Sequence, residues 1–291
     1  DEETKSLTIL ETLVEQALLK GIQPSPQWVL ILGSYKALHQ YQWCGQLSLT
    51  QDLQAILAMQ VFEPQQEHYL KTKIPILKEL SDKVSSKVRD QYEESPYPKW
   101  IDLGLILSPA PIAKVVKALK VRLADHKIFE VEAPAILIAG CGTGQHSIDT
   151  AARFKNAKVL AIDLSLSSLA YAQRKTEALG VQNLEYMQAD LLDLGQLNKT
   201  FDIIESSGVL HHMEKPMAGW KVLVSCLKVG GLMKIGLYSE LARQHIAKMR
   251  EEIQQLNTET DHIGMKRFRN GVIRSKSPHH QLIISSPDFH S

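Results

Sequence analysis

Beyond residue 135, short apolar runs alternate with helical patterns, and this alternation restricts the possible folds more than any other feature of the sequence. Strand-length apolar runs occupy residues 135–139, 158–163, 184–190, 201–207 and 230–239. Helical patterns occupy residues 145–154, 165–179, 214–227 and about 240–256. Strands that alternate with helices form parallel sheets with helices on both faces, so we predict a Rossmann-like, doubly wound α/β fold. Ligands of such sheets bind beyond the carboxyl ends of the strands.

The first part of the chain, residues 1–91, is predicted to be a helical region. Apolar residues recur there at helical spacing, which is typical of helices that pack on helices. One such pattern starts at Ile76 and places Ile76, Leu80, Val84 and Val88 in a single narrow stripe. We expect protein partners to use this region.

Residues 92–130 are predicted to hold a linker rich in aromatic residues and proline, followed by a lead-in helix. Pro96 and Pro98 prevent regular helix around them, and Tyr92, Tyr97 and Trp100 lie within nine residues. The spacing alone favours a linker whose aromatic side chains pack on the next domain. The alternative is a lid that faces the substrate, because aromatic side chains on a proline-stiffened loop make a rigid binding surface.

Charge and cysteine content exclude several classes of function. The formal net charge of the 291 residues is +1, which gives no electrostatic basis for binding nucleic acid. The apolar runs are too short to span a membrane. Cys44, Cys141 and Cys226 are scattered and odd in number, so we expect a reducing, cytoplasmic setting without disulfides or a metal centre.

Three glycines follow the first predicted strand in the sequence ILIAGCGTGQHS, at positions 140, 142 and 144. A P-loop requires a lysine after its last glycine, and none is present. A dinucleotide fingerprint requires its third glycine at position 145, where the chain has Gln145. The glycines therefore predict a loop that approaches a ligand closely without a pyrophosphate signature, with helix amides offered to a carboxylate.

Two aspartates end the second and third predicted strands. Asp163 lies nineteen residues after Gly144, where a carboxylate can accept both hydroxyls of a ribose. Asp190 can accept a hydrogen bond from an exocyclic amine such as that of adenine. Either acid alone is more often a helix cap or a turn residue, but together with the glycines they predict a nucleoside site.

This combination resembles the class I S-adenosylmethionine-dependent methyltransferases over residues 134 to about 240. The resemblance rests on ILIAGCGTG, AID with Asp163, MQADLLDL with Asp190, FDIIESSGVLHHM and LKVGGLMKIGLYS. The loop GVLHHM is similar to that of small-molecule methyltransferases of the ubiquinone-biosynthesis and sterol type. One departure is Ala139, because many members carry an Asp or Glu earlier in this motif to contact the methionine amino group.

The resemblance implies S-adenosylmethionine as cofactor and methyl transfer as the reaction. The cofactor-binding residues that it implies are Gly140, Cys141, Gly142, Thr143, Gly144, Asp163, Leu164, Asp190 and Leu191. A second similarity, that of the linker itself to the linker of bacterial methyltransferases with tetratricopeptide repeats, favours the lid interpretation of Tyr92, Tyr97 and Trp100. If the acceptor is a hydroxyl group a base is needed, and His211 is the preferred candidate of the pair His211 and His212. A non-catalytic interpretation of this pair, with one ring packed and the other solvated, is favoured over a catalytic one.

A complete sheet of this family has seven strands, of which the sequence supplies five in the order 3-2-1-4-5. We therefore expect the methyltransferase domain, residues 131–291, to be incomplete at its C-terminal end. The apolar run Gln281–Ser286 is expected in a loop, and the fifth strand at an exposed edge, with Leu232, Ile235 and Leu237 poorly covered.

The segment VSSKVRDQYEESPYPKW is similar to the linker of bacterial methyltransferases that carry tetratricopeptide repeats. This similarity and the absence of an initiator methionine lead us to expect a fragment of a longer protein. The acceptor, expected to be a small molecule, stays open to a sugar, a lipid head group or a protein. Two other functions also stay open: a scaffold without catalysis, and a nicotinamide-dependent oxidoreductase, against which Gln145 argues.

Overall fold

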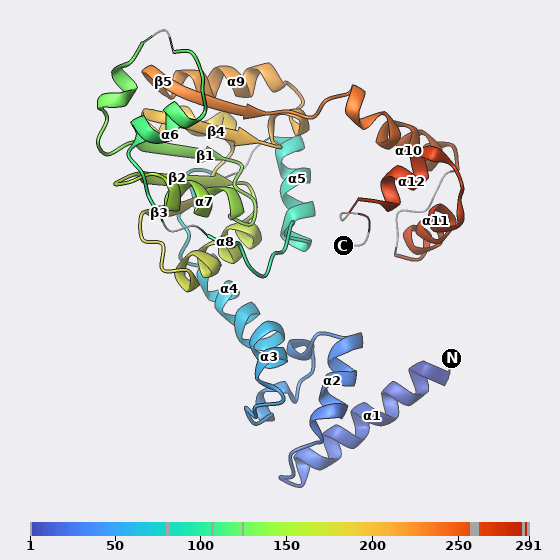
Figure 1. Ribbon diagram of the computed structural model, residues 1–291. Coiled ribbons are helices and arrows are strands. Elements are labelled where there is room, and N and C mark those ends of the chain that lie inside the picture. The colour runs from blue at the N-terminus through green and yellow to red at the C-terminus, as the bar shows by residue number, and fades with distance from the viewer. Residues whose placement is uncertain are drawn as a thin grey trace. The chain divides into compact units, whose positions relative to one another are not determined.

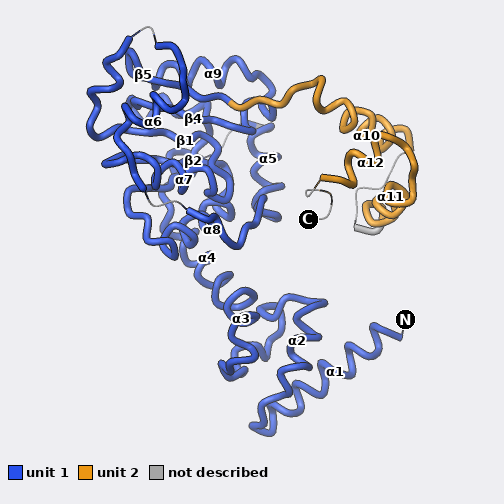
Figure 2. The backbone as a smooth tube through the Cα atoms, viewed as in Figure 1, with its two compact units in different colours: residues 1–235 blue, residues 236–291 orange. Residues whose placement is uncertain are grey.

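The structure is a computed structural model that describes residues 2–79, 82–105, 108–123, 125–256, 262–286 and 289. The chain divides into two compact units, residues 1–235 and residues 236–291 (Figure 2). The first unit contains the sheet and the N-terminal helices. The second contains only helices in its described part after β5.

The N-terminal region of the first unit is helical, as predicted from the sequence. Its helices are α1 (Glu2–Leu19), α2 (Pro26–Tyr35), α3 (Gln54–Leu57) and α4 (Glu63–Lys71), with a π-helical turn at Ala58–Phe62 and short 3₁₀ turns at Leu38–Gln40 and Cys44–Gln46. Val14, Val29, Leu32 and Leu38 form the centre of a separate apolar core among these helices. The region therefore buries its own apolar surface.

The sheet has five strands in the order β3-β2-β1-β4-β5, as predicted (Figure 1). The strands are β1 (Ala135–Ala139), β2 (Lys158–Asp163), β3 (Leu184–Gln188), β4 (Phe201–Ser207) and β5 (Leu227–Gly236). β1 pairs in parallel with β2 and β4, and β2 pairs in parallel with β3. The chain order reverses beside β1, which places a topological switch point at the carboxyl ends of β1 and β4.

Helices cover both faces of the sheet, because the central strands are apolar on both sides. Ile136 and Ile138 of β1 pack on the face covered by α6 (Ile112–Ala118), α7 (Gln145–Arg153) and α8 (Leu166–Ala178). Leu137 and Ala139 pack on the opposite face, with α9 (Pro216–Ser225) and the 3₁₀ turn Leu191–Leu197. The remaining 3₁₀ turns of this unit are Lys127–Glu130 and Leu210–His212.

The sequence predicts one helix that starts at Ile76, whereas in the structure this helix, α5, spans only Lys83–Glu94. Ile76 instead forms a parallel bridge with Gln188 at the end of β3, and the amide of Leu77 donates to the Gln188 carbonyl at 2.9 Å. The helix begins after Asp82, whose Oδ1 accepts from the Ser85 amide at 2.8 Å. The hydrogen bonds at the helix cap and at the sheet edge satisfy backbone groups that a longer helix would have used. They therefore decide the start of the helix against the pattern of apolar residues from Ile76. Leu80, which belongs to that pattern, lies outside the described residues.

α4 joins the N-terminal region to α8 through a buried arginine. The side chain of Arg174 on α8 is 7% exposed, and it contacts Glu67 of α4 at 2.8 Å and Glu63 at 3.0 Å. A buried guanidinium requires such partners, because an uncompensated charge would be costly. This ion-pair group ties the helical region to the sheet domain.

In the second unit, the described helices are α10 (Gln244–Gln255), α11 (His262–Arg274) and α12 (Pro278–Ile284), preceded by a 3₁₀ turn at Leu241–Arg243. The prediction that Gln281–Ser286 lies in a loop is wrong, since α12 extends to Ile284. The pair Ser277 and Pro278 marks the start of α12 and was the signal for it. No described helix in either unit is both long and apolar enough to cross a membrane.

Candidate functional site

The glycine loop, residues 140–144, connects β1 to α7 at the carboxyl edge of the sheet. The amides of Gly140 and Cys141 both donate to the Ile162 carbonyl at 2.9 Å, which fastens the loop to β2. Gly140, with φ of 77°, leaves no room for a side chain, because a Cβ there would lie 2.1 Å from Cγ2 of Val209. Gly144 is similarly enclosed, because a Cβ placed on it would lie 2.6 Å from Cβ of Ala172.

Gly142 is the glycine that is open to a ligand. A Cβ placed on it would have one neighbour within 4 Å, the Tyr97 carbonyl oxygen at 3.6 Å. The sequence predicted close approach at both Gly140 and Gly142. Packing inside the protein explains the glycines at 140 and 144, and Gly142 is the least enclosed of the three; close approach of a ligand to Gly140 and Gly142 stays a prediction.

Asp163 ends β2 next to this loop, with Leu164 directly after it. Its Oδ2 accepts from the Gly142 amide at 2.8 Å, and its Oδ1 accepts from the Ser165 amide at 3.1 Å. Burial raises the pKa of this carboxyl group, while the amide hydrogen bonds oppose the rise. Each oxygen keeps acceptor capacity beyond its one amide, as a pair of ribose hydroxyls would require.

Asp190 lies beyond the end of β3 and is buried together with Leu191. Its Oδ1 accepts from the Leu192 amide at 2.9 Å, so it caps the 3₁₀ turn that follows. The two acidic positions are connected through the backbone, because the Ala189 amide donates to the Asp163 carbonyl at 3.1 Å. The predicted pair of acids and the glycine loop therefore lie at the same edge of the sheet.

The aromatic segment, residues 92–100, packs against the glycine loop. Oγ1 of Thr143 donates to the Pro98 carbonyl at 2.5 Å, and Nε1 of Trp100 donates to the Thr143 carbonyl at 3.0 Å. Oγ of Ser165 donates to the Tyr92 carbonyl at 3.1 Å. The structure thus brings this segment to the predicted cofactor residues.

Within the aromatic segment, the three rings differ in their surroundings. Trp100 is buried and meets Tyr171 of α8 edge to face, with ring centroids 6.0 Å apart. Tyr92 is half-buried, and Tyr97 is exposed. Trp100 is therefore an anchor, as the packing interpretation expected, and Tyr97 is the most exposed ring of the three.

Glu93 is a contact residue that the sequence did not single out. Its Oε1 accepts from the Ser167 amide at 3.1 Å, in the first turn of α8, and Lys71 lies 3.4 Å from its Oε2. Burial alone would raise the pKa of Glu93, but hydrogen bonds from Ser167 and the charge of Lys71 lower it overall. The carboxylate therefore fastens the end of α5 to the N-terminus of α8, where negative charge is favourable.

A second group missed from the sequence contains Glu205 of β4. Glu205 is the register partner of Ile138 on β1, and its buried carboxylate contacts Nε2 of His146, Oγ1 of Thr150 at 3.2 Å and Nζ of Lys234 at 3.8 Å. Burial alone would raise the pKa of Glu205, but the hydrogen bond and charge of His146 and the charge of Lys234 lower this pKa overall. The signal in the sequence was an acid inside the otherwise apolar strand FDIIESS.

His211 and His212 lie on the 3₁₀ turn after β4. His211 is half-buried and His212 is exposed, and their ring centroids are 4.3 Å apart. His211 is thus the more enclosed of the two rings, and the choice between a packing role and a catalytic role for it stays open. The turn follows Val209, which packs on Gly140, so His211 belongs to the same edge of the sheet as the glycine loop.

Comparison with known proteins identifies the class of this domain. Residues 136–231 match the family described as a methyltransferase domain. This match confirms the methyltransferase domain that the glycine loop, Asp163 and Asp190 predicted for this part of the chain.

Several individual proteins are similar to the chain. An uncharacterized protein of Synechococcus sp. is 41% identical over 127 residues, covering 43% of this chain and 30% of that protein. Malonyl-[acyl-carrier protein] O-methyltransferase of Halalkalibacterium halodurans is 31% identical over 118 residues, covering 39% of this chain and 43% of the enzyme. The structure of PKMT2 from Rickettsia typhi in complex with AdoHcy is similar with a TM-score of 0.43 and 18% identity, covering 54% of this chain and 33% of that one. The chain thus spans less than half the length of each of these proteins.

Proposed function

We propose that the chain binds S-adenosylmethionine at the carboxyl edge of the sheet and transfers its methyl group to a small-molecule acceptor. The observation that carries the proposal is the hydrogen bond between the Gly142 amide and Asp163. It joins the least enclosed glycine of the loop to the acid of β2, and this supports a nucleoside site at that position. The domain that performs this function begins near residue 131 in the proposal, and the family match over residues 136–231 supports that limit.

The cofactor contacts follow from the atoms that are free to make them. Asp163 would accept the ribose hydroxyls on the lone pairs that Gly142 and Ser165 do not use. Asp190 would accept from the adenine amine through the oxygen that does not cap the turn, with Leu164 and Leu191 beside the base. Cys141 and Thr143 contribute backbone to the loop, and burial keeps the Cys141 thiol protonated because it raises its pKa well above the usual range.

The bound sulfonium would supply an already activated methyl group, so the protein has to orient the reactants and exclude water. The aromatic segment would do both, with Trp100 fixed on Thr143 and the exposed Tyr97 beside Gly142. His211 would accept a proton from the acceptor if the methyl group goes to oxygen. The similarity of the aromatic segment to the linker of tetratricopeptide-repeat methyltransferases extends the proposal to that subtype.

Direct measurement of methyl transfer tests the proposal. The chain would be incubated with S-adenosylmethionine carrying a labelled methyl group and with a cell extract separated into small-molecule and protein fractions. Label transferred to the small-molecule fraction and absent with Asp163→Ala is the expected result. Label in the protein fraction would redirect the acceptor to a protein, and cofactor binding without transfer to either fraction would indicate the scaffold alternative.

His211 requires a separate test, because it can bind or position without accepting a proton. His211→Gln should retain S-adenosylmethionine binding and lose turnover, while the matched change His212→Gln should alter neither. Equal turnover in the two variants would remove His211 from the reaction.

A further inference from the structure

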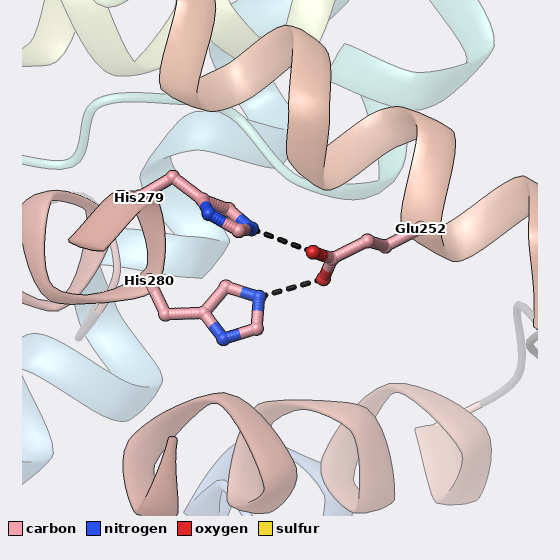
Figure 3. A group of neighbouring side chains, drawn as sticks. All are labelled: Glu252, His279 and His280. Carbon is pink, nitrogen blue, oxygen red and sulfur yellow. Dashed lines mark hydrogen bonds and ion pairs between the residues drawn. The ribbon is translucent and has the colours of Figure 1, made fainter. Parts of the chain in front are cut away.

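The second unit contains a group of side chains that the proposed function does not use: Glu252 of α10 and His279 and His280 of α12 (Figure 3). Nε2 of His279 lies 2.6 Å from Oε1 of Glu252, and Nε2 of His280 lies 2.6 Å from Oε2. The two histidine side chains are 17% and 12% exposed, and Glu252 is 33% exposed. Two imidazoles and one carboxylate thus converge between two helices in a largely covered position.

A hydrogen-bonded link between the helices accounts for only part of this arrangement. Nδ1 of His279 has Oγ of Ser277 at 3.1 Å. Nδ1 of His280, by contrast, is buried and has no hydrogen-bond partner among the described residues. The hydrogen bonds of the described residues therefore satisfy only one nitrogen of this ring, the Nε2 that faces Glu252.

We propose that Glu252, His279 and His280 form a binding site for a divalent transition-metal ion, with Zn²⁺ as the ion that fits best. One ligand atom from each residue can be chosen so that all three lie within 4.8 Å of one another. Zinc ions take histidine nitrogen at about 2.0–2.1 Å and carboxylate oxygen at about 2.0–2.2 Å, so small side-chain rotations would bring all three to one ion. Two histidines and one carboxylate leave a fourth position for water, which the partly exposed Glu252 side admits.

The surroundings agree with this assignment. Coordination through Nε2 of His279 places its ring proton on Nδ1, where Ser277 can accept it, as metal-binding histidines commonly require. The ion would join α10 to α12 and stabilise the fold of the second unit.

Calorimetric titration of the whole chain with ZnCl₂, after dialysis against a chelator, tests the site. The expected result is one bound Zn²⁺ for this site and a rise in thermal stability with Zn²⁺ concentration. Both effects should be lost in Glu252→Gln and His279→Ala. Glu251→Gln and His245→Ala, both on α10, are the controls, and both should bind Zn²⁺ as the unaltered chain does.

Two outcomes would overturn the assignment. If the unaltered chain binds no Zn²⁺, the three residues form only a hydrogen-bonded link. If Glu252→Gln and His279→Ala bind Zn²⁺ as tightly as the controls, the ion lies elsewhere on the chain. Circular dichroism of each variant establishes that the helices remain folded, and Glu252→Gln, which keeps the side-chain shape, carries the test if a histidine variant unfolds.

Discussion

The backbone amide of Gly142 donates a hydrogen bond of 2.8 Å to Oδ2 of Asp163, across 21 residues of chain. The bond fixes the carboxylate of β2 relative to the open glycine of the loop, and the Ser165 amide holds its other oxygen at 3.1 Å. The carboxylate that would accept the ribose hydroxyls is therefore preorganised. Preorganisation favours binding because the side chain loses less conformational freedom when the ligand binds.

Asp163→Ala is expected to weaken S-adenosylmethionine binding by about 1.5–3 kcal/mol for each charge-assisted hydrogen bond that is lost, before any non-additivity. Isothermal titration calorimetry measures the change. Asp149→Ala is the control, because Asp149 lies on α7 and pairs with Arg153 rather than with the glycine loop. Unchanged affinity in Asp163→Ala would disprove the ribose assignment.

Gly140→Ala is expected to destabilise the fold by about 1–3 kcal/mol, because it forces a side chain into a left-handed backbone and onto Val209. Urea denaturation measures this loss. The control is Gly195→Ala, at a position where a Cβ meets nothing within 4 Å and φ is not in the left-handed range. If the two variants are equally stable, the loop is not held as described.

The strands of the sheet and their order could be predicted from the sequence because each strand is marked by a local pattern of apolar residues. β1, β2 and β4 begin and end where the apolar runs predicted, since each run is bounded by polar or turn residues. β5 was displaced: the apolar run indicated residues 230–239, whereas the strand is Leu227–Gly236. The prediction begins the strand at Gly230 and Gly231, whereas the strand begins three residues earlier, at Leu227.

The contacts around the site could be predicted only in part, because many of them join residues far apart in the chain. The glycine loop, Asp163 and Asp190 carry a local pattern, and the structure brings all three to one edge. Glu93 acquires its position from Ser167, 74 residues later, and no spacing rule connects them. Their roles in binding and catalysis stay predictions.

Trp100→Phe is expected to loosen the aromatic segment from the glycine loop. The change removes the donor to the Thr143 carbonyl and leaves that buried acceptor unpaired, which costs about 1–3 kcal/mol. Hydrogen exchange at residues 97–100 should accelerate and cofactor affinity should fall. Trp28→Phe, in the N-terminal helical region, should leave both unchanged, and the same exchange rates in both variants would refute the anchoring role.

Glu205→Gln is expected to destabilise the fold at neutral pH by about 1–3 kcal/mol, because the buried ionic partner of His146 and Lys234 is lost. The lowered pKa of Glu205 gives this effect a direction with pH. Its stabilisation is fully present above the unfolded carboxyl pKa of about 4.3 and is lost as the pH falls through the lower folded value.

Denaturation curves at several pH values should therefore show the difference between Glu205→Gln and the unaltered chain shrinking in acid. Glu185→Gln is the matched control, since Glu185 is exposed on β3. A stability difference that does not change down to the acid limit of folding would contradict the ionic role of Glu205.

Val229→Lys is expected to reduce aggregation without altering stability. β5 is the last strand of the sheet order and has no buried residue, and Val229 is fully exposed on it. An exposed apolar edge strand invites pairing with another chain, and lysine on such an edge opposes it. Because the Val229 side chain is fully exposed, the free energy of unfolding should stay within about 0.5 kcal/mol of that of the unaltered chain.

Light scattering over time compares this variant with Val224→Lys, which adds the same charge at an exposed position on α9. Equal suppression by the two variants would mean that net charge, and not the edge of β5, controls association.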